Sequence, residues 1–368
     1  MLLLVADQWR ARLDGLRAPN LDRLAREGVT YSRAYTTFPV CCPSRAAMLT
    51  GKYPHQAGIT GNHQQLPLGE RTFSAAMKQA GYRTGYIGKW HLDGRESPGY
   101  VPPERRRGFD YWAANNVVHK HYDWAYFGDS PEPIEVSGFA PDYQTDLALE
   151  FFRRPGAEPY FLYVAWVAPH PPLTPPERHN TYDAARIPLS PNTPTRPEGI
   201  AAYYALCSAV DENVGRLLAA VDDNTIVVFT ADHGWTLGAH GLDRIDQPYE
   251  ECIRVPLIVR HPGRRHAEER NGSLFSNIDL APLLTSLCGV PWPDRPKRRQ
   301  ELFAEAWPGS GSPDEWRLIL RGNRKLVVDG AGKPIHYYDL QRDPYELDNR
   351  VASAPPDLLA RLLTFAER

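Results

Sequence analysis

The sequence has no apolar segment long enough to cross a lipid bilayer and no strong excess of charge of either sign. Its 368 residues carry a formal net charge of -2, so no overall basic field favours nucleic acid or an anionic membrane as a partner. The short apolar start, residues 1–6, lacks a preceding basic region and ends at Asp7, which is unlike a secretory signal. We therefore expect a soluble protein with neither a membrane nor a nucleic-acid partner.

Cysteine is also scarce, and the five cysteines are scattered along the chain. They are Cys41, Cys42, Cys207, Cys252 and Cys288. An odd and scattered set makes a poor disulfide framework and is more typical of reduced thiols in a cytosol. We therefore expect a cytoplasmic location.

Apolar runs alternate with helix-like segments along most of the chain. This alternation predicts an α/β fold, in which a central and mostly parallel sheet lies between helices. The candidate strands are 2–6, 84–87, 160–167 and 225–230. The candidate helices are 18–27, 44–49, 73–80 and 200–221.

A stretch rich in proline, glycine and arginine, residues 291–313, has the composition of a domain boundary. It divides the chain into a large domain, 1–290, and a C-terminal subdomain, 291–368. In the subdomain we expect a small antiparallel sheet and a closing helix after Pro355, with Asp357 as its cap. The expected strands are 316–320, 325–328 and 335–340.

Polar side chains directly follow all four candidate strands of the large domain. They are Asp7 and Gln8, Lys89 and His91, His170, and Asp232 and His233. Because ligands of open α/β sheets bind at the carboxyl ends of strands, these groups are expected to converge on one site. Taken singly, each has an ordinary alternative as a helix cap, a turn residue or a surface side chain.

If the polar groups converge, they offer two kinds of chemistry. Asp7, Gln8, Asp232 and His233 supply oxygen and imidazole ligands that suit a divalent cation. Lys89, His91 and His170 supply hydrogen-bond donors for an anionic group and a route for a proton.

Cys41 is a candidate for a reactive thiol. Pro43 suits the first turn of a helix, so Cys41 is expected just before a helix amino end, where the helix dipole stabilises an anion. The alternative is a buried structural cysteine between a loop and a helix.

The segment 41–51, CCPSRAAMLTG, resembles the signature of the type I sulfatase family, Cys-x-Pro-Ser-Arg followed by Leu-Thr-Gly. Pro43 and Arg45 fix the register, so the match selects Cys41 and not Cys42. Other segments resemble the family in its expected order: 19–24, 88–92, 231–234, 254–257 and 338–346.

The resemblance implies the fold of the alkaline phosphatase superfamily and a nucleophile made by oxidation of Cys41 to formylglycine. A separate formylglycine-generating enzyme would make it. The implied metal ligands are Asp7, Gln8, the modified Cys41, Asp232 and His233. The implied ion is Ca²⁺, with Mg²⁺ or Mn²⁺ as alternatives.

The resemblance also implies roles for the residues around the metal. Arg45 and Lys89 would stabilise the nucleophile, and Lys89 would also reach the sulfate. His91 would act as a base, and His170 would contact the sulfate and protonate the leaving oxygen. The implied reaction is hydrolysis of a small sulfate ester.

The sequence departs from the family pattern in three ways. Gln8 stands where many members have a second aspartate, which also fits members that act on phosphonate or phosphate esters. Arg244 is the cation nearest to the position of a family lysine after His240, and we expect Arg244 to bind substrate in its place. The chain is also short for the family.

Two points stay open at this stage. A phosphonate monoester or phosphodiester hydrolase, or a non-catalytic subunit with the same fold, are alternatives to a sulfatase. A polar and aromatic group within 112–121 is interpreted as an ordinary surface loop, although it offers residues for a substrate pocket. Its members are Trp112, Asn115, Asn116, His119, Lys120 and His121.

Overall fold

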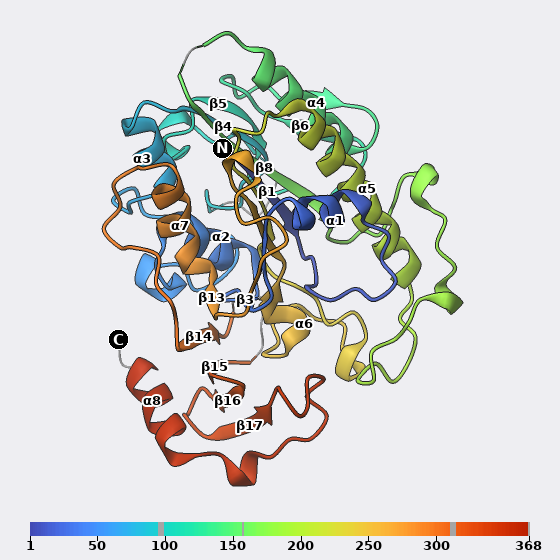
Figure 1. Ribbon diagram of the computed structural model, residues 1–368, viewed down its shortest axis with the longest axis vertical. Coiled ribbons are helices and arrows are strands. Elements are labelled where there is room, and N and C mark those ends of the chain that lie inside the picture. The colour runs from blue at the N-terminus through green and yellow to red at the C-terminus, as the bar shows by residue number, and fades with distance from the viewer. Residues whose placement is uncertain (95–98, 157, 310–313, 367–368) are drawn as a thin grey trace.

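A twisted sheet of eight strands forms the centre of the protein in a computed structural model that describes residues 1–94, 99–156, 158–309 and 314–366 (Figure 1). Its strand order is β12-β2-β11-β9-β1-β8-β4-β5. The five strands from β9 to β5 are parallel, and β11 is antiparallel to both of its neighbours. In the same order their bounds are Arg270–Asn271, Val29–Tyr31, Leu257–Arg260, Val227–Ala231, Leu2–Asp7, Tyr160–Pro169, Arg83–Lys89 and Tyr111–Asn115.

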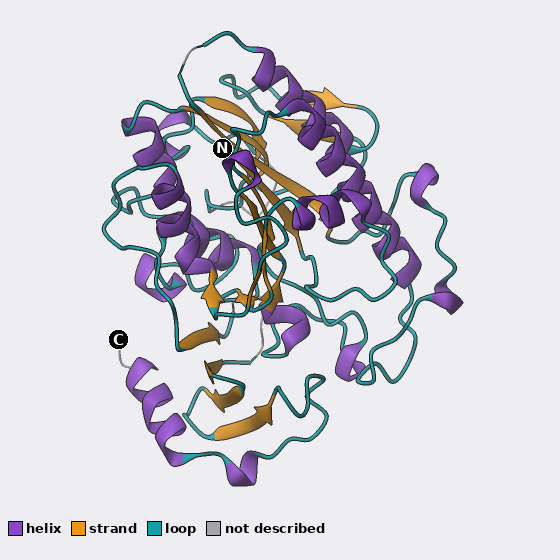
Figure 2. Ribbon diagram, viewed as in Figure 1, coloured by secondary structure: helices purple, strands orange, loops and turns teal. Residues whose placement is uncertain are grey.

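Helices cover both faces of this sheet (Figure 2). One layer contains α1 (Pro19–Arg26), α4 (Ala140–Arg153) and α5 (Ile200–Ala220), and the other contains α2 (Cys41–Thr50), α3 (Phe73–Gln79) and α7 (Leu280–Leu287). Because the sheet is covered twice, β1 is apolar except at its last residue and fully buried. The predicted α/β sandwich with a mostly parallel sheet is confirmed.

A smaller antiparallel sheet follows near the C-terminus. Its strands pair in sequence order, and α8 (Pro356–Ala366) packs against β15. Their bounds are β14 Glu301–Ala306, β15 Trp316–Arg321, β16 Arg324–Asp329 and β17 Pro334–Asp339. The predicted small C-terminal sheet is confirmed, and it has one more strand than expected. The division at 290/291 stays a prediction, and residues 310–313 of the predicted boundary lie outside the described residues.

Two minor sheets and a short helix complete the fold. One sheet has the order β10-β3-β13, and the other pairs β6 with β7. Their bounds are Arg254–Val255, Ala34–Tyr35, Phe275–Ser276, Trp124–Tyr126 and Ile134–Val136, and the short helix α6 spans Glu250–Ile253.

Two predicted element bounds need correction. The strand predicted at 225–230 begins later, as β9, because Thr225 forms a turn: its N–H donates to the carbonyl oxygen of Asp222 (3.1 Å) and its hydroxyl to the Asp222 carboxylate (2.7 Å). The helix predicted at 44–49 begins at Cys41, so Cys41 lies in the first turn of α2 and not before it.

In the described part of the chain, no helix combines the length and the apolar character that crossing a membrane requires. All five cysteines are free thiols, and four of them are buried. The cytoplasmic location stays a prediction.

Candidate active site

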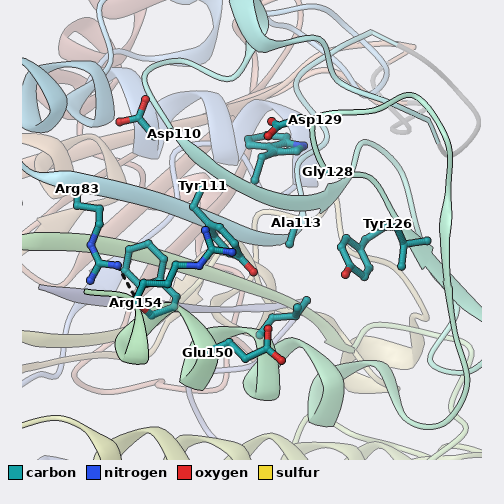
Figure 3. A pocket seen from close by; sticks show the side chains of 13 residues that line it. Arg83, Asp110, Tyr111, Ala113, Tyr126, Gly128, Asp129, Glu150 and Arg154 are labelled. Atoms are coloured by element: carbon teal, nitrogen blue, oxygen red, sulfur yellow. Dashed lines mark hydrogen bonds between the residues drawn. The ribbon is translucent and has the colours of Figure 1, made fainter. Parts of the chain in front are cut away.

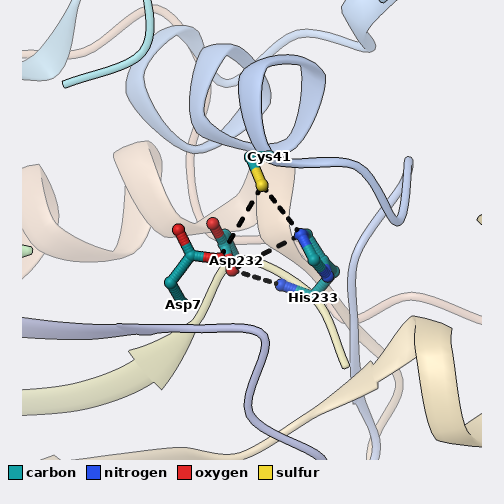
Figure 4. A group of neighbouring side chains, drawn as sticks. All are labelled: Asp7, Cys41, Asp232 and His233. Carbon is teal, nitrogen blue, oxygen red and sulfur yellow. Dashed lines mark hydrogen bonds and ion pairs between the residues drawn. The ribbon is translucent and has the colours of Figure 1, made fainter. Parts of the chain in front are cut away.

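The carboxyl ends of β1, β4 and β9 bring polar side chains to one end of the sheet, as expected. β1 ends at Asp7, β4 ends at Lys89, and Asp232 and His233 directly follow β9. Asp7, Cys41, Asp232 and His233 point toward one another and have ligand atoms within 4.8 Å of each other (Figure 4). We call these four residues the Cys41 cluster. All four side chains are buried.

The sulfur of Cys41 lies at the centre of the Cys41 cluster. Its distance is 3.2 Å to His233 Nε2 and 3.7 Å to Asp7 Oδ1, and Lys89 Nζ lies 3.6 Å away. Helix α2 holds the sulfur in place because every residue of this helix is buried. The amino end of the helix also faces the cluster with its partial positive charge.

Two buried cations balance the two carboxylates. Arg45 donates to Asp7 Oδ2 (3.1 Å), to Asp232 Oδ2 (3.1 Å) and to the carbonyl oxygen of Lys89 (2.8 Å). Lys89 Nζ donates to Asp7 Oδ2 at 2.7 Å. Burial alone would raise the pKa of Asp7, but the positive charges of Lys89 and Arg45 outweigh it and hold this pKa well below its ordinary value. Asp7 is therefore ionised at neutral pH.

His233 presents one ring nitrogen to the Cys41 cluster. Its Nδ1 lies 2.8 Å from the carbonyl oxygen of Gly234, which orients Nε2 toward the Cys41 sulfur. Burial disfavours a charged ring, yet Asp232 and Cys41 outweigh it and raise the pKa of His233 to about 10. The raised pKa reflects the acidic neighbours of this ring, Asp232 and Cys41. Two carboxylates, an imidazole and a sulfur within one buried site fit a divalent cation.

Gln8 reaches the site through its backbone. Its N–H donates to Asp232 Oδ1 at 3.0 Å, and its carbonyl oxygen accepts from the Tyr203 hydroxyl at 2.8 Å. The residue is buried and has a left-handed backbone, with φ of 65°. Its amide as a metal ligand stays a prediction.

His91 and His170 each have an imidazole neighbour that the sequence did not indicate. His91 Nε2 lies 3.4 Å from His63 Nδ1, and the His170 ring stacks on His119 with centroids 4.5 Å apart. Burial and the positive charges of Lys89 and Arg45 lower the pKa of His91 well below its ordinary value. Burial, Lys89 and His119 lower the pKa of His170 to about 3, against the effect of Asp7. Both rings are therefore neutral at pH 7.

The interpretation of 112–121 as an ordinary surface loop is wrong. Trp112, Asn115, Asn116 and His121 are buried, and His121 Nε2 lies 2.8 Å from the carbonyl oxygen of His170. Strand β5 begins this segment and pairs with β4, which draws the segment against the site. No comparable sequence signal marks His63, which a loop brings to His91.

Arg244 has other partners in the structure. Its Nε donates to Asp246 Oδ1 at 2.9 Å, Nη2 also binds Asp246, and Nη1 lies 3.7 Å from Asp314 Oδ2. Its role in substrate binding stays a prediction, as do the individual roles of the residues that surround Cys41.

A separate cavity of about 460 Å³ lies along the outer edge strand β5 (Figure 3). Arg83, Tyr111, Glu150 and Arg154 are among the side chains that line it. Its lining includes Trp112 but none of the residues predicted for catalysis or metal binding, so we assign it no part in the chemistry described here.

An α/β sandwich with a buried thiol, carboxylates and an imidazole at the carboxyl ends of its strands has the features of a metal-dependent ester hydrolase. Residues 2–290 match the family model "Sulfatase". The chain belongs to the sulfatase family, within the alkaline phosphatase superfamily. The family and the names of its relatives support hydrolysis of sulfate esters.

Relatives of known sequence agree with this assignment. The ulvan-active sulfatase of Formosa agariphila is 30% identical over 95% of this chain and 76% of the relative. The uncharacterized sulfatase YidJ of Escherichia coli is 31% identical over 76% of this chain and 64% of the relative.

Solved structures have the same fold. A putative sulfatase from Bacteroides fragilis is 26% identical, with a TM-score of 0.90. The match covers 100% of this chain and 95% of that structure. The phosphonate monoester hydrolase of Agrobacterium radiobacter has a TM-score of 0.77 at 22% identity, over 100% of this chain and 94% of that structure. At this lower identity the likeness shows the fold alone.

Proposed function

We propose that this chain hydrolyses sulfate esters of carbohydrates with residue 41 as the nucleophile, after Cys41 is oxidised to formylglycine. The observation that carries the proposal is the environment of the Cys41 sulfur, which has His233 Nε2 at 3.2 Å and Lys89 Nζ at 3.6 Å. A nucleophile that lies beside residues able to bind a metal cation, and beside an ammonium group, is suited to attack on an anionic ester. The name of the ulvan-active relative supports a carbohydrate ester.

The sulfatase signature at 41–51 supports the modification of Cys41. A formylglycine at this position would supply a hydrated aldehyde with two hydroxyl groups, one to serve as the nucleophile and one to allow release of the product, whereas a thiol lacks the second group. A formylglycine-generating enzyme is the partner that this maturation requires.

We propose that Asp7, Gln8, residue 41, Asp232 and His233 hold one divalent cation. Oxygen ligands predominate in this set, which favours Ca²⁺. Mg²⁺ or Mn²⁺ are the alternatives, because Gln8 is a neutral ligand where many family members have a second aspartate, and because His233 would be a neutral ligand once the cation displaced its ring proton. The bound cation supplies Lewis-acid polarisation of the nucleophile and of the ester.

The remaining residues divide the work of binding and proton transfer. Lys89 Nζ contacts a sulfate oxygen, and Arg45 holds Asp7 and Asp232 in position. His91 is neutral because its pKa is well below the ordinary value, so it can accept a proton. His170 donates a proton to the leaving oxygen, and the anionic ester raises its affinity for that proton.

A phosphonate monoester or phosphodiester is the second candidate substrate. Gln8 is the observation that favours it, because family members that act on phosphonate or phosphate esters can have the same arrangement of Asp-Gln and Asp-His that this chain has at 7–8 and 232–233. The printed name "Multifunctional alkaline phosphatase superfamily protein PehA" belongs to a relative from Trinickia caryophylli that is 25% identical over 95% of this chain.

The mass of the tryptic peptide that contains Cys41, from protein made in its native host, tests the nucleophile. We expect the mass of the aldehyde or of its hydrate. An unmodified thiol in protein from the native host would remove the proposed mechanism and favour the non-catalytic subunit.

A panel of 4-nitrophenyl sulfate, a phosphodiester and a phosphonate monoester tests the substrate class. We expect the highest kcat/KM for the sulfate and no turnover by Cys41→Ala. Because Cys42 is equally buried but is not selected by the signature, Cys42→Ala is the matched control and should retain activity. A higher kcat/KM for the phosphonate would favour the second candidate.

A further inference from the structure

A continuous groove lies between the edge of the main sheet and the C-terminal sheet. Two cavities, of about 620 Å³ and about 360 Å³, form it and share Asn271, Ser273, Leu274 and Arg298 in their walls. The isolated bridge between Leu274 and Arg299 joins its two sides. We call this feature the Arg298 groove.

The Arg298 groove is locally basic although the whole chain is not. Five basic and two acidic side chains line it, a net charge of +3, whereas the chain carries -2. The basic residues are Arg33, Arg270, Lys297, Arg298 and Arg299, and the acidic residues are Glu269 and Asp279.

Several of these charges are already neutralised by partners. Asp279 Oδ1 accepts from Arg299 Nη2 at 2.7 Å, and Lys297 donates to Asp294 at 3.0 Å. Arg270 and Arg298 are exposed, and neither forms an ion pair with another residue in the described part of the chain. These two guanidinium groups are therefore available to an anionic ligand.

The chemistry of the groove fits a chain of sulfated sugars. Guanidinium groups bind sulfate oxygens in a bidentate manner, and several cations along one groove favour repeated anionic groups. Ser273 and Asn271 offer hydrogen bonds to sugar hydroxyls. Tyr31 and Phe275, with ring centroids 5.4 Å apart, offer an apolar surface to a sugar ring.

Nucleic acid is also a polyanion, but it fits this protein less well. The sequence pI is about 6.6, and proteins that bind nucleic acid through charge are generally much more basic. The remaining acidic surface would repel a long, stiff duplex that extends beyond the groove.

The groove is also connected to the helix of the nucleophile. β13 ends at Ser276, and the following residue, Asn277, donates to Ser44 Oγ (3.1 Å) and accepts from Thr37 N–H (3.1 Å). Ser44 belongs to α2, the helix that begins at Cys41. One segment therefore forms a wall of the groove and supports the active-site helix.

We propose that the Arg298 groove binds a sulfated polysaccharide chain away from the Cys41 cluster. The inference rests on the proposed function in one respect, because it takes this polysaccharide to be the polymeric form of the substrate. When part of a polysaccharide is bound in the groove, the effective concentration of its other sulfate esters at the active site is higher.

Binding of dextran sulfate to the full-length protein tests the proposal, with uncharged dextran as the ligand control. We expect the wild type to bind dextran sulfate and not dextran. The variant Arg270→Ser/Arg298→Ser should bind dextran sulfate about tenfold more weakly, because two charge-assisted contacts are lost. The control Arg71→Ser/Arg153→Ser removes two exposed charges outside the groove and should change affinity less than about twofold.

Turnover of 4-nitrophenyl sulfate by the same proteins separates this inference from the proposed function. We expect both double variants to keep the wild-type kcat/KM, because a small ester does not reach the groove. Equal binding of dextran sulfate by the groove variant and the wild type would overturn the proposal. Duplex DNA bound as tightly as dextran sulfate at the same salt concentration would also overturn it. If the wild type binds dextran sulfate but turns over no sulfate ester, the proposed function fails instead.

Discussion

Arg45 is the side chain that joins α2 to two of the proposed metal ligands, Asp7 and Asp232. It starts from α2 and bonds Asp7 on β1, Asp232 after β9 and the last carbonyl group of β4. Its planar guanidinium group can donate to all three acceptors at once, whereas the shorter side chain of a lysine, with a single ammonium group, cannot keep the same geometry. The requirement for arginine at this position is therefore not a requirement for positive charge alone.

Replacement of Arg45 by lysine tests that conclusion. We expect Arg45→Lys to lower kcat on 4-nitrophenyl sulfate by about 10²-fold or more, because preorganised contacts to two ligands are lost. The bound metal, measured by elemental analysis, should fall as well. Arg71→Lys, at an exposed position, is the control and should change neither quantity. If Arg45→Lys keeps both its kcat and its metal, charge is sufficient at this position.

His170 gives a pH dependence with a definite sign. Its folded-state pKa is lowered to about 3 from 6.5, mainly by burial, so the unfolded chain binds the proton more strongly. His170 therefore does not reduce the free energy of unfolding above pH 6.5, and it reduces this free energy increasingly as the pH falls from 6.5 toward 3. The loss is about 1.4 kcal/mol for each pH unit below 6.5, or about 2 kcal/mol between pH 7 and pH 5.

Urea unfolding of the wild type and of His170→Gln at pH 7 and pH 5 measures this contribution. We expect the free energy of unfolding of the wild type to fall more steeply, by about 2 kcal/mol over this interval, because glutamine does not titrate. Equal slopes for the two proteins would mean that His170 has an ordinary pKa in the folded state.

At the scale of elements, β4 lies unusually close to β8 at Gly88. This residue has φ of 109°, and a Cβ atom built on it would lie 2.0 Å from the carbonyl oxygen of Ala165. Only glycine fits there, and the next residue is Lys89, which contacts Asp7 and Cys41. The approach of the two strands therefore fixes the starting point of the Lys89 side chain.

Gly88→Ala should both destabilise the protein and impair the site. We expect a loss of about 2–4 kcal/mol in the free energy of unfolding, from overpacking and the unfavourable φ. We also expect kcat to fall at a temperature where the variant is still folded. Gly69→Ala is the control, since its Cβ would meet no atom within 4 Å and its φ is ordinary. Similar stability of the two variants would show that the strands can separate without cost.

How well the elements could be predicted depended on how local their signals are. The strands 2–6 and 160–167 are continuous apolar runs because both sheet faces are covered, and the sequence pattern found them. The strand β14, with glutamates at Glu301 and Glu305, was missed. Glu305 is buried and pairs with His55, a partner 250 residues away that no local pattern reveals.

The same distinction applies to the site. Asp7, Lys89 and Asp232 were predictable because parallel strands end at one edge of a sheet, and Cys41 because its signature is specific. His63 was not predictable, because a loop carries it to His91. For Arg244, the sequence position suggested a role in substrate binding but did not indicate that its guanidinium group would donate to Asp246.

At the scale of the whole molecule, a buried ion network joins the C-terminal sheet to the large α/β body. Lys325 on β16 is fully buried, and its Nζ lies 2.5 Å from Glu346 Oε1 and 3.3 Å from Glu250 Oε1. Glu250 begins α6, and its N–H donates to Glu346 Oε2 at 2.8 Å. Burial alone would lower the pKa of Lys325, but Glu346 and Glu250 outweigh it and raise this pKa.

Removal of this lysine charge should therefore weaken the attachment of the C-terminal sheet. We expect Lys325→Met to lower the free energy of unfolding by about 3–5 kcal/mol, because it leaves the buried Glu346 and the half-buried Glu250 without the ammonium group that they share. Burial raises the pKa of Glu346 to about 8, so Lys325→Met/Glu346→Gln should recover part of this loss by replacing a buried carboxyl group with a neutral amide. The neighbour Arg324 is exposed on the same strand, so Arg324→Met should cost less than about 0.5 kcal/mol. Guanidinium unfolding of the four proteins would compare these values. If Lys325→Met were no less stable than Arg324→Met, the network would not hold the two parts together, and apolar contacts alone would have to do so.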